Sequence, residues 1–332
     1  MMEYRQLGGS DLKVSAVTMG TWAIGGWMWG GTDERAAVAA IQQAVDVGMT
    51  SIDTAPMYGF GLAEEIVGKA IAGRRDQVQV LTKYGMRWDL QEGQFWFKTT
   101  TFEGKQVPVH RCAKAHSVIE ECERSLKRLG VDVIDLFQCH WRDNTTEVEE
   151  TMEAVAKLLK QGKIKAAGVS NFTVEEIDAA RKVVPLASNQ PPYSMVKRDT
   201  EAELVPYCIA NNVGLVVYSP MQLGLLSGKL TMDREFTGDD QRRNSPYFRP
   251  DNRRKVIDFL EAIRPIADEH NATVAQLVIN WTIHRPGITA ALVGARNPKQ
   301  AAENAKAADF TLTDQETARI NELLDKLDLT LK

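Results

Sequence analysis

Short apolar runs alternate with amphipathic, helix-like segments along almost the whole of this 332-residue chain. Such alternation is typical of a parallel sheet whose strands are joined by helical crossovers. Eight repeats of this kind predict a (β/α)8 TIM barrel, which commonly reaches this length as one domain, here residues 1–332. The predicted strands are Ala16–Met19, Thr50–Asp53, Val78–Lys83, Val133–His140, Ala166–Ser170, Ala187–Gln190, Val213–Tyr218 and Ala290–Val293.

Helix boundary signals support this division of the chain. Thr173 and Thr273 precede periodic apolar segments, where a hydroxyl can cap the first backbone N–H groups. Gly48, Gly130 and Gly162 follow such segments, as helix-ending glycines do. The predicted helices are Asp33–Val47, Ala63–Ala72, Lys114–Leu129, Val148–Gln161, Val174–Val183, Glu201–Asn211, Thr273–His284 and Pro298–Ala307.

Several stretches lie outside the repeat. Tyr4–Val14 predicts an N-terminal hairpin, and Lys255–His270 and Thr313–Leu327 predict peripheral helices on the barrel exterior. Tyr84–Arg111 and Leu223–Asn252 are too long for ordinary barrel loops. Long loops at the carboxyl face of a barrel usually carry function, so both are expected to border a site.

The composition narrows the class of ligand. A net charge of −4, from 40 basic and 44 acidic side chains spread along the chain, provides no broad field for nucleic acid or an anionic membrane. A small-molecule substrate is therefore expected. The chain shows neither a signal peptide nor an apolar run of about 18 residues, which predicts a cytoplasmic protein. Its four cysteines lack CxxC spacing, so reduced thiols and no metal site are expected.

Polar side chains end several of the predicted strands or follow them closely: Asp53, Tyr58, Lys83, His140 and Gln190. The barrel brings these positions to one face. A phenol with a pKa near 10 donates a proton to a carbonyl poorly unless a cation stabilises its anion. An ammonium about 4 Å away contributes ~4 kcal/mol, enough to lower the pKa by roughly three units before desolvation opposes it. Lys83 is expected to supply that charge, Asp53 to hold Lys83, and neutral His140 to orient a substrate carbonyl.

Each residue also has a purely structural interpretation when it is taken alone. An aspartate at a strand end, such as Asp53, is most often a cap or turn former. Ser170 and Asn171 read equally well as a helix N-cap pair, and Tyr218 as barrel lining. The order and number of the motifs argue for the functional interpretation.

Seven motifs occur in a fixed order: DTAPMYG, LTKYG, DLFQCHWRD, GVSNF, NQPPYS, VVYSPMQLGLLSGK and VGARNPKQAAEN. Together they make the chain resemble the aldo-keto reductase superfamily over nearly its whole length. It is most similar to bacterial members that share the cofactor site of Kv-channel β-subunits. The resemblance implies that Asp53, Tyr58, Lys83 and His140 form a catalytic tetrad in which Tyr58 is the general acid of carbonyl reduction.

The resemblance further implies an NADP-dependent oxidoreductase that reduces aldehydes or ketones and is reversible with polyols or sugars. An alternative is a redox-sensing regulatory subunit that binds NADP(H) with little turnover. Selection of NADP is expected to depend on Arg296, aided by Arg242 or Arg243, because the lysine-serine pair of many members is absent here. The implied cofactor residues are Thr21, Trp22, Ser170, Asn171, Gln190, Tyr218, Ser219, Pro220, Gln222, Leu223, Gly224, Lys229, Gly294, Arg296, Gln300, Glu303 and Asn304.

Overall fold

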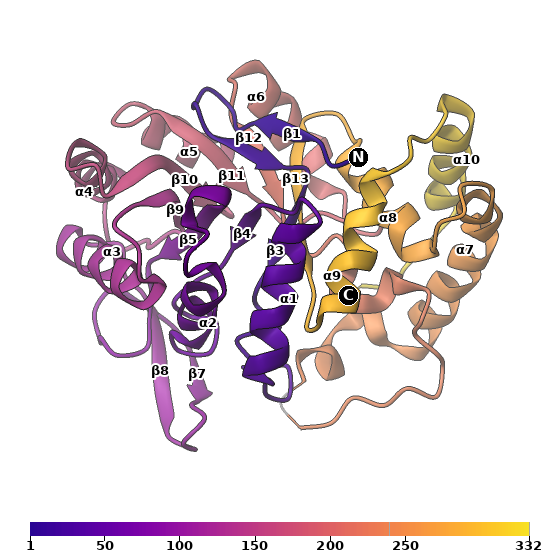
Figure 1. Cartoon of the computed structure of the whole chain (residues 1–332), viewed down its shortest axis with the longest axis horizontal. Helices are drawn as coiled ribbons and strands as arrows, with labels where there is room; N and C mark the ends of the chain where they lie inside the picture. Colours follow the sequence, from indigo (N-terminus) through magenta and orange to yellow (C-terminus); the bar gives the residue numbers. More distant parts are fainter. Residues whose placement is uncertain (239, 332) are drawn as a thin grey trace.

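Eight parallel strands form a closed barrel, as predicted, in the computed structural model, which describes residues 1–238 and 240–331 (Figure 1). Residue 239, in the predicted loop Leu223–Asn252, and residue 332, at the end of the predicted domain, lie outside the described residues. The barrel closes where β13 pairs in parallel with β3, and the neighbouring strands follow in chain order around the ring. The strands are β3 (Val17–Gly20), β4 (Ser51–Asp53), β5 (Gln79–Tyr84), β9 (Ile134–Cys139), β10 (Ile164–Ser170), β11 (Leu186–Gln190), β12 (Gly214–Val217) and β13 (Ile288–Gly294).

Helices surround the barrel and begin at the expected caps. Thr173 and Thr273 each form a capping box with the residue three positions on, Glu176 and Gln276. The predicted helix Glu201–Asn211 is shorter in the structure, because Pro206, which lacks an N–H, is accommodated only in a first turn. The helices are α1 (Glu34–Asp46), α2 (Leu62–Ile71), α3 (Ala115–Leu129), α4 (Val148–Lys160), α5 (Val174–Arg181), α6 (Leu204–Ala210), α8 (Val274–Ile283) and α9 (Pro298–Ala305).

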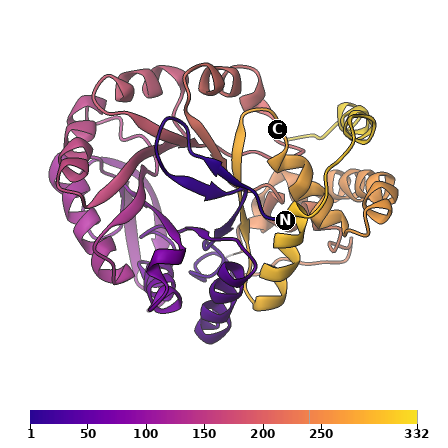
Figure 2. The ribbon, with the colours of Figure 1, turned by 45° about the horizontal axis from the view of Figure 1, so that its top comes forward.

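The predicted N-terminal hairpin consists of β1 (Tyr4–Gln6) and β2 (Lys13–Ser15), paired antiparallel. It lies across one end of the barrel (Figure 2). Leu7 and Val14 are fully buried there and join the apolar cluster inside the barrel, which includes Leu81, Leu136 and Leu292. The hairpin therefore covers the end opposite the carboxyl ends of the strands.

The two predicted peripheral helices are also present. They are α7 (Pro250–Glu269) and α10 (Asp314–Asp325), which pack beside α8 on one side of the barrel (Figure 1). Short 3-10 turns complete the chain at η1 (Arg75–Gln77), η2 (Asp199–Glu201), η3 (Gln222–Ser227), η4 (Gln241–Asn244), η5 (Pro246–Phe248) and η6 (Lys306–Ala308).

The segment predicted as the long loop Tyr84–Arg111 is more ordered than expected. It contains a three-stranded antiparallel sheet of β6 (Met86–Arg87), β8 (Gln106–Arg111) and β7 (Gln94–Thr100), in that spatial order. Aromatic and β-branched residues, which favour strands, are common in β7 and β8. The β7–β8 hairpin projects from the barrel (Figure 1).

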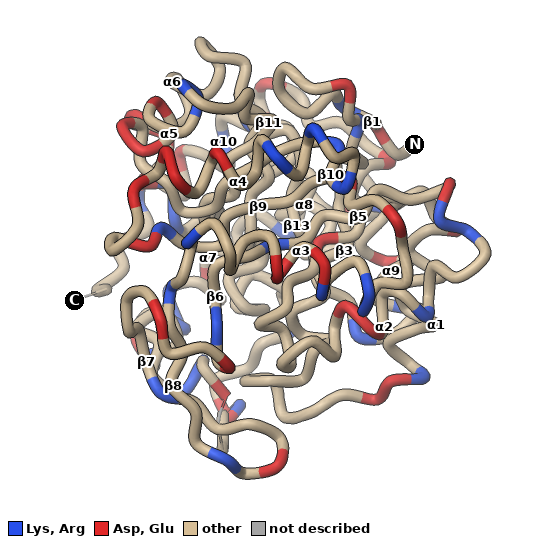
Figure 3. The backbone as a smooth tube through the Cα atoms, turned by 90° about the vertical axis from the view of Figure 1, so that its left-hand side faces the viewer, with Lys and Arg blue, Asp and Glu red and all other residues tan. Residues whose placement is uncertain are grey.

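Acidic and basic residues are interspersed on the face shown in Figure 3. Within the described residues, no helix combines the length and apolar character needed to cross a membrane.

Candidate active site

The four predicted catalytic residues converge at the carboxyl ends of β4, β5 and β9. Asp53 ends β4, Lys83 lies next to the end of β5, and His140 directly follows β9. The ammonium of Lys83 donates to Asp53 Oδ1 at 2.5 Å and to the backbone oxygen of Thr54 at 3.0 Å. It also donates to the phenolic oxygen of Tyr58 at 3.2 Å. Lys83 is fully buried, so its charge is stabilised by these oxygens rather than by bulk water.

The direction of the Tyr58 pKa differs from the effect expected of Lys83. Burial raises the pKa of Tyr58 well above its ordinary value, and the Asp53 carboxylate raises it further. Burial also lowers the pKa of Lys83, while Asp53 opposes that change. Desolvation disfavours both charged forms, and here it outweighs the attraction between ammonium and phenolate. Tyr58 is thus a protonated phenol at neutral pH.

His140 supplies a neutral ring beside the phenol. Burial, and secondly the charge of Lys83, hold the pKa of His140 well below its usual range. The two rings meet edge to face with centroids 5.8 Å apart. A neutral imidazole carries one N–H donor, so His140 can donate a hydrogen bond to an oxygen placed near Tyr58.

The second oxygen of Asp53 is held by two amides inside the barrel. Gln190 Nε2 donates to Asp53 Oδ2 at 2.8 Å, and Gln138 Nε2 donates to the same oxygen at 3.4 Å. Gln138 is not among the residues predicted from the sequence, although it lies two residues before His140 and alternate residues of a strand share one face. That spacing was the available signal. The amides fix the carboxylate so that its other oxygen faces Lys83.

Hydrogen bonds connect the residues expected beside a nicotinamide ring. Ser170 Oγ donates to the backbone oxygen of Gln190 at 2.8 Å. Asn171 Nδ2 donates to the backbone oxygen of His140 at 3.1 Å and to Ser170 Oγ at 2.9 Å. Tyr218 donates to Asn171 Oδ1 at 2.9 Å. The structure therefore brings Ser170, Asn171, Gln190 and Tyr218 together next to His140.

Thr21 and Trp22 lie on the other side of the tetrad. The backbone N–H and the hydroxyl of Thr21 both donate to the backbone oxygen of Asp53 at 3.0 Å. Trp22 stacks on Tyr58 with ring centroids 6.1 Å apart and meets Trp29 edge to face. These contacts place Trp22 against the ring of Tyr58.

The segment expected to bind pyrophosphate has an unusual backbone. Ser219, Gln222, Leu223 and Gly224 have φ angles of 58°, 44°, 56° and 91°. Backbone in the left-handed region turns N–H groups toward a common point and forms anion-binding concavities. A Cβ added at Gly224 would meet only Arg242 Nη1, 4.0 Å away, so the backbone there is accessible to a ligand. The N–H groups of Gln222 and Gly224 donate to the backbone oxygens of Ser219 and Met221 at 2.9 Å, so this segment offers a dinucleotide phosphate the open backbone at Gly224 together with Pro220 and the exposed Lys229.

The expected adenosine end lies on the turn from β13 into α9. Arg296 donates through Nη1 to the backbone oxygen of Trp29 at 3.3 Å and through Nη2 to that of Gly31 at 2.6 Å. Lys229 reaches across to Glu303 at 3.4 Å. The guanidinium of Arg242 forms an ion pair with Asp240 and is directed to that carboxylate.

Two other predicted residues of this turn have local partners. Gln300 Oε1 accepts from the backbone N–H of Arg296 at 2.8 Å, and Asn304 Nδ2 donates to the backbone oxygen of Gly294 at 3.1 Å. Both side chains therefore shape the turn around Arg296.

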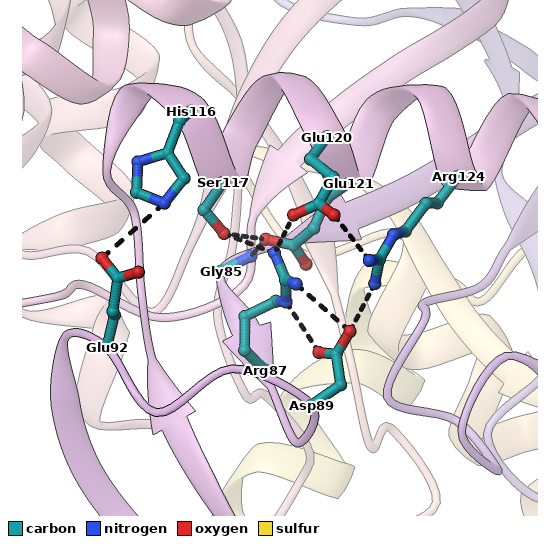
Figure 4. A network of polar contacts seen from close by, with 9 residues as sticks. All are labelled: Gly85, Arg87, Asp89, Glu92, His116, Ser117, Glu120, Glu121 and Arg124. Atoms are coloured by element: carbon teal, nitrogen blue, oxygen red, sulfur yellow. Dashed lines mark hydrogen bonds and ion pairs between the residues drawn. The ribbon is translucent and has the colours of Figure 1, made fainter.

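A polar network that includes side chains of α3 lies against the end of β5 (Figure 4). Glu121 Oε1 accepts from the backbone N–H of Gly85 at 2.9 Å and from Ser117 Oγ at 3.3 Å. Arg87 Nη1 donates to Ser117 Oγ at 2.8 Å, and its Nε donates to Asp89 at 2.8 Å. Burial raises the pKa of Glu121 to about 8. The network thus holds the backbone two residues beyond Lys83.

The four cysteines are free and buried. Cys139 packs in the cluster between barrel and helices, which confirms that it faces away from His140. Within residues 1–238 and 240–331, no group of three or more histidine, cysteine or acidic side chains is arranged to hold a metal ion.

Comparison with known proteins gives a consistent result. The family model described as "Aldo/keto reductase family" matches residues 16–325. Aldo-keto reductase YhdN of Bacillus subtilis is 39% identical over 98% of this chain and 94% of its own length. The NADH-specific methylglyoxal reductase of Escherichia coli is 34% identical over 97% of this chain and 98% of its own length.

Solved structures of an aldo-keto reductase and of a glycerol dehydrogenase are also similar over nearly the whole chain. The glycerol dehydrogenase AKR11B4 from Gluconobacter oxydans superimposes with a TM-score of 0.88 at 37% identity, covering 98% of this chain and 95% of that one. The holo form of the aldo-keto reductase AKR11C1 from Bacillus halodurans superimposes with a TM-score of 0.78 at 28% identity, covering 97% and 96%.

Proposed function

Since this chain belongs to the aldo/keto reductase family, we propose that it reduces aldehydes or ketones to alcohols with NADPH and oxidises polyols or sugars in reverse. The family places it among enzymes of carbonyl and alcohol oxidoreduction that use a nicotinamide cofactor. One observation carries the proposal: buried Lys83 contacts Asp53 at 2.5 Å and Tyr58 at 3.2 Å. This arrangement supports a tyrosine that gives up a proton inside the barrel.

The chain's own residues divide the acid–base work. Tyr58 donates its proton to the substrate oxygen, and the ammonium of Lys83 stabilises the phenolate that remains. Asp53 holds Lys83 in place, while Gln138 and Gln190 hold Asp53. Neutral His140 donates a hydrogen bond that orients the carbonyl oxygen toward the phenol. A bound nicotinamide cofactor supplies the hydride that the carbonyl carbon receives.

The linked residues next to His140 are the proposed contacts of the nicotinamide: Ser170, Asn171, Gln190 and Tyr218. Gln190 Nε2 donates to Asp53. Gln190 can therefore contact a carboxamide only through its Oε1 or after a change of rotamer. The open backbone at Gly224 and the exposed Lys229 support phosphate binding there. Use of NADPH depends on Arg296, whose guanidinium is suited to a phosphate.

We place the protein in the cytoplasm, where thiols are kept reduced. Its four free, buried cysteines support that location.

The proposal is tested by a substrate panel of aldehydes, ketones and polyols, assayed with both NADPH and NADH by nicotinamide absorbance. We expect steady-state reduction of at least one carbonyl class and faster turnover with NADPH. The E. coli relative named NADH-specific makes the paired cofactors essential. Tight cofactor binding without turnover of any substrate would instead indicate a sensor.

A further inference from the structure

Arg111, the last residue of β8, lies on the face of the hairpin that packs toward the active site. Its strand neighbour two positions earlier, Val109, is fully buried and joins the apolar cluster of Trp27 and Met57, next to Tyr58. Because alternate residues of a strand share one face, Arg111 is directed to the same side as Val109. Its half-buried position agrees with this placement.

A β-bulge brings a tryptophan to Arg111. The register of β7 against β8 shifts between Phe95 and Phe97, so Trp96 is the extra residue. Bulges redirect side chains next to active sites. Trp96 meets Trp141, the residue after His140, with ring centroids 5.0 Å apart. The two indoles thus form an aromatic wall that extends from His140 to the hairpin.

The guanidinium of Arg111 lies against both indoles, 4.0 Å from the Trp96 ring centroid and 5.0 Å from that of Trp141. Among the residues that the structure describes, none accepts a hydrogen bond from it, and its Nε is buried without a partner. Burial lowers the pKa of Arg111, a further sign that the cation is partly removed from water. A planar fork of donors in such a place is suited to a carboxylate or phosphate.

The carboxylate of Asp143 does not fill this role. Its oxygens accept from the backbone N–H groups of Ala113 at 3.1 Å and Thr145 at 2.9 Å, and from the hydroxyls of Thr145 and Thr146 at 2.7 Å. Asp143 attracts Arg111 without a direct ion pair among the described contacts. The fork therefore retains its capacity for a ligand.

We propose that Arg111, held against the rings of Trp96 and Trp141, determines substrate specificity by binding an oxyanion group, a carboxylate or phosphate, on the carbonyl substrate. The inference rests on the proposed carbonyl reduction. Trp96 and Trp141 pack against the apolar cluster that contains Met57, the residue before Tyr58, so the oxyanion would be held on the side of Tyr58 that faces the hairpin. The substrate class is an oxo acid or a phosphorylated aldehyde.

The test compares matched pairs of substrates that differ only in charge. 4-Oxobutanoate is paired with butanal for the carboxylate, and glyceraldehyde 3-phosphate with glyceraldehyde for the phosphate. In the wild type we expect a higher kcat/KM for the charged member of at least one pair, and the preferred pair identifies the oxyanion. Arg111→Met is expected to lower the charged-to-neutral ratio of kcat/KM by about 10- to 150-fold, the worth of a charge-assisted contact.

Two further variants make the result specific. Arg111→Lys keeps the charge but loses the fork, so we expect a smaller fall in the ratio; this variant also serves if Arg111→Met does not fold. Lys98→Met removes an exposed cation from the same hairpin and controls for long-range electrostatics, so its ratio should match the wild type. As a measurement independent of mutation, succinate or inorganic phosphate should inhibit butanal reduction by the wild type competitively.

Equal charged-to-neutral ratios in wild type and Arg111→Met, for both pairs, would overturn the inference and leave Arg111 as a stacking residue. A wild type without preference for either charged member would overturn it too. Failure of the proposed function has a different signature, because then even butanal and glyceraldehyde are not reduced.

Discussion

The ammonium of Lys83 and the phenol of Tyr58 lie 3.2 Å apart, close enough for the lysine to donate a hydrogen bond to the tyrosine oxygen. Lys83 also donates to Asp53 at 2.5 Å, so one ammonium forms hydrogen bonds with both a carboxylate and a phenol. Burial nevertheless raises the pKa of Tyr58. In the proposed reduction, Tyr58 therefore starts as a protonated acid, and Lys83 would act mainly on the phenolate that appears as the proton leaves.

Replacement of Tyr58 by phenylalanine is expected to lower kcat/KM for carbonyl reduction by about 10²–10⁴-fold, the usual contribution of a general acid. Cofactor affinity should change little, because the hydroxyl contacts the substrate oxygen. Steady-state kinetics and tryptophan quenching by NADPH measure the two quantities. Near wild-type turnover in folded Tyr58→Phe protein would disprove the role of Tyr58.

Replacement of Lys83 by methionine is expected to lower activity and move the basic limb of the reductive pH profile upward. Reduction needs the protonated phenol, so activity is lost as pH rises through the pKa of Tyr58. Removing the cation leaves burial and Asp53, which both raise that pKa. Profiles of kcat/KM for Lys83→Met and the surface control Lys69→Met test this, and a basic limb that stays in place would show that another group sets the pKa.

Replacement of Arg296 by alanine is expected to weaken NADPH binding by roughly 10- to 150-fold, as one charge-assisted contact is worth ~1.5–3 kcal/mol. NADH lacks the 2′-phosphate and should bind almost as before. A structural role for Arg296 would give a different result, since Arg296 also donates to the backbone of Trp29 and Gly31. Equal losses for both cofactors, measured by tryptophan quenching, would mean that Arg296 supports this loop without recognising the phosphate.

Buried Glu121 makes the stability of the protein depend on pH. Its pKa is raised from the ordinary value of 4.5 to about 8 in the folded state, so the native protein binds the proton more tightly. This contribution is fully present below pH 4.5 and is lost as pH rises through about 8. Its size is on the order of a few kcal/mol, because one pKa unit corresponds to about 1.4 kcal/mol.

We therefore expect Glu121→Gln to lose less stability than the wild type between those two pH values, as measured by urea unfolding. Glu120→Gln is the matched control, because Glu120 lies on the same helix but forms partly exposed ion pairs. Identical pH dependence in Glu121→Gln and wild type would contradict the raised pKa.

The sequence predicted the barrel because it depends on local patterns, and the same patterns brought the four proposed catalytic residues to attention. Buried parallel strands are short apolar runs, and Asp53 and Lys83 stand out at their ends. Gln138 was missed because it lies inside such a run, where only its spacing from His140 distinguishes it. The segment Tyr84–Arg111 is predicted as a long loop because it interrupts the alternation of strands and helices, and the pairing of β7 with β8 inside it lies outside that repeat.

Other features depend on the closed structure and could not be predicted. Arg296 and Trp29 are 267 residues apart and meet only because β13 closes the ring against β3. The pKa of Tyr58 depends on how completely it is buried, which no sequence spacing specifies. The same is true of the position of Arg111 against two indoles.

The hairpin across the barrel end has a consequence for protein synthesis. Leu7 and Val14 leave the ribosome early, yet the cluster that buries them includes Leu292 in β13. Until Ile288–Gly294 has emerged, β12 and β3 remain open edges that invite pairing with other chains. The nascent chain therefore carries exposed Leu7 and Val14 and two unpaired strands until β13 has been translated, and binding by chaperones would protect it during that interval.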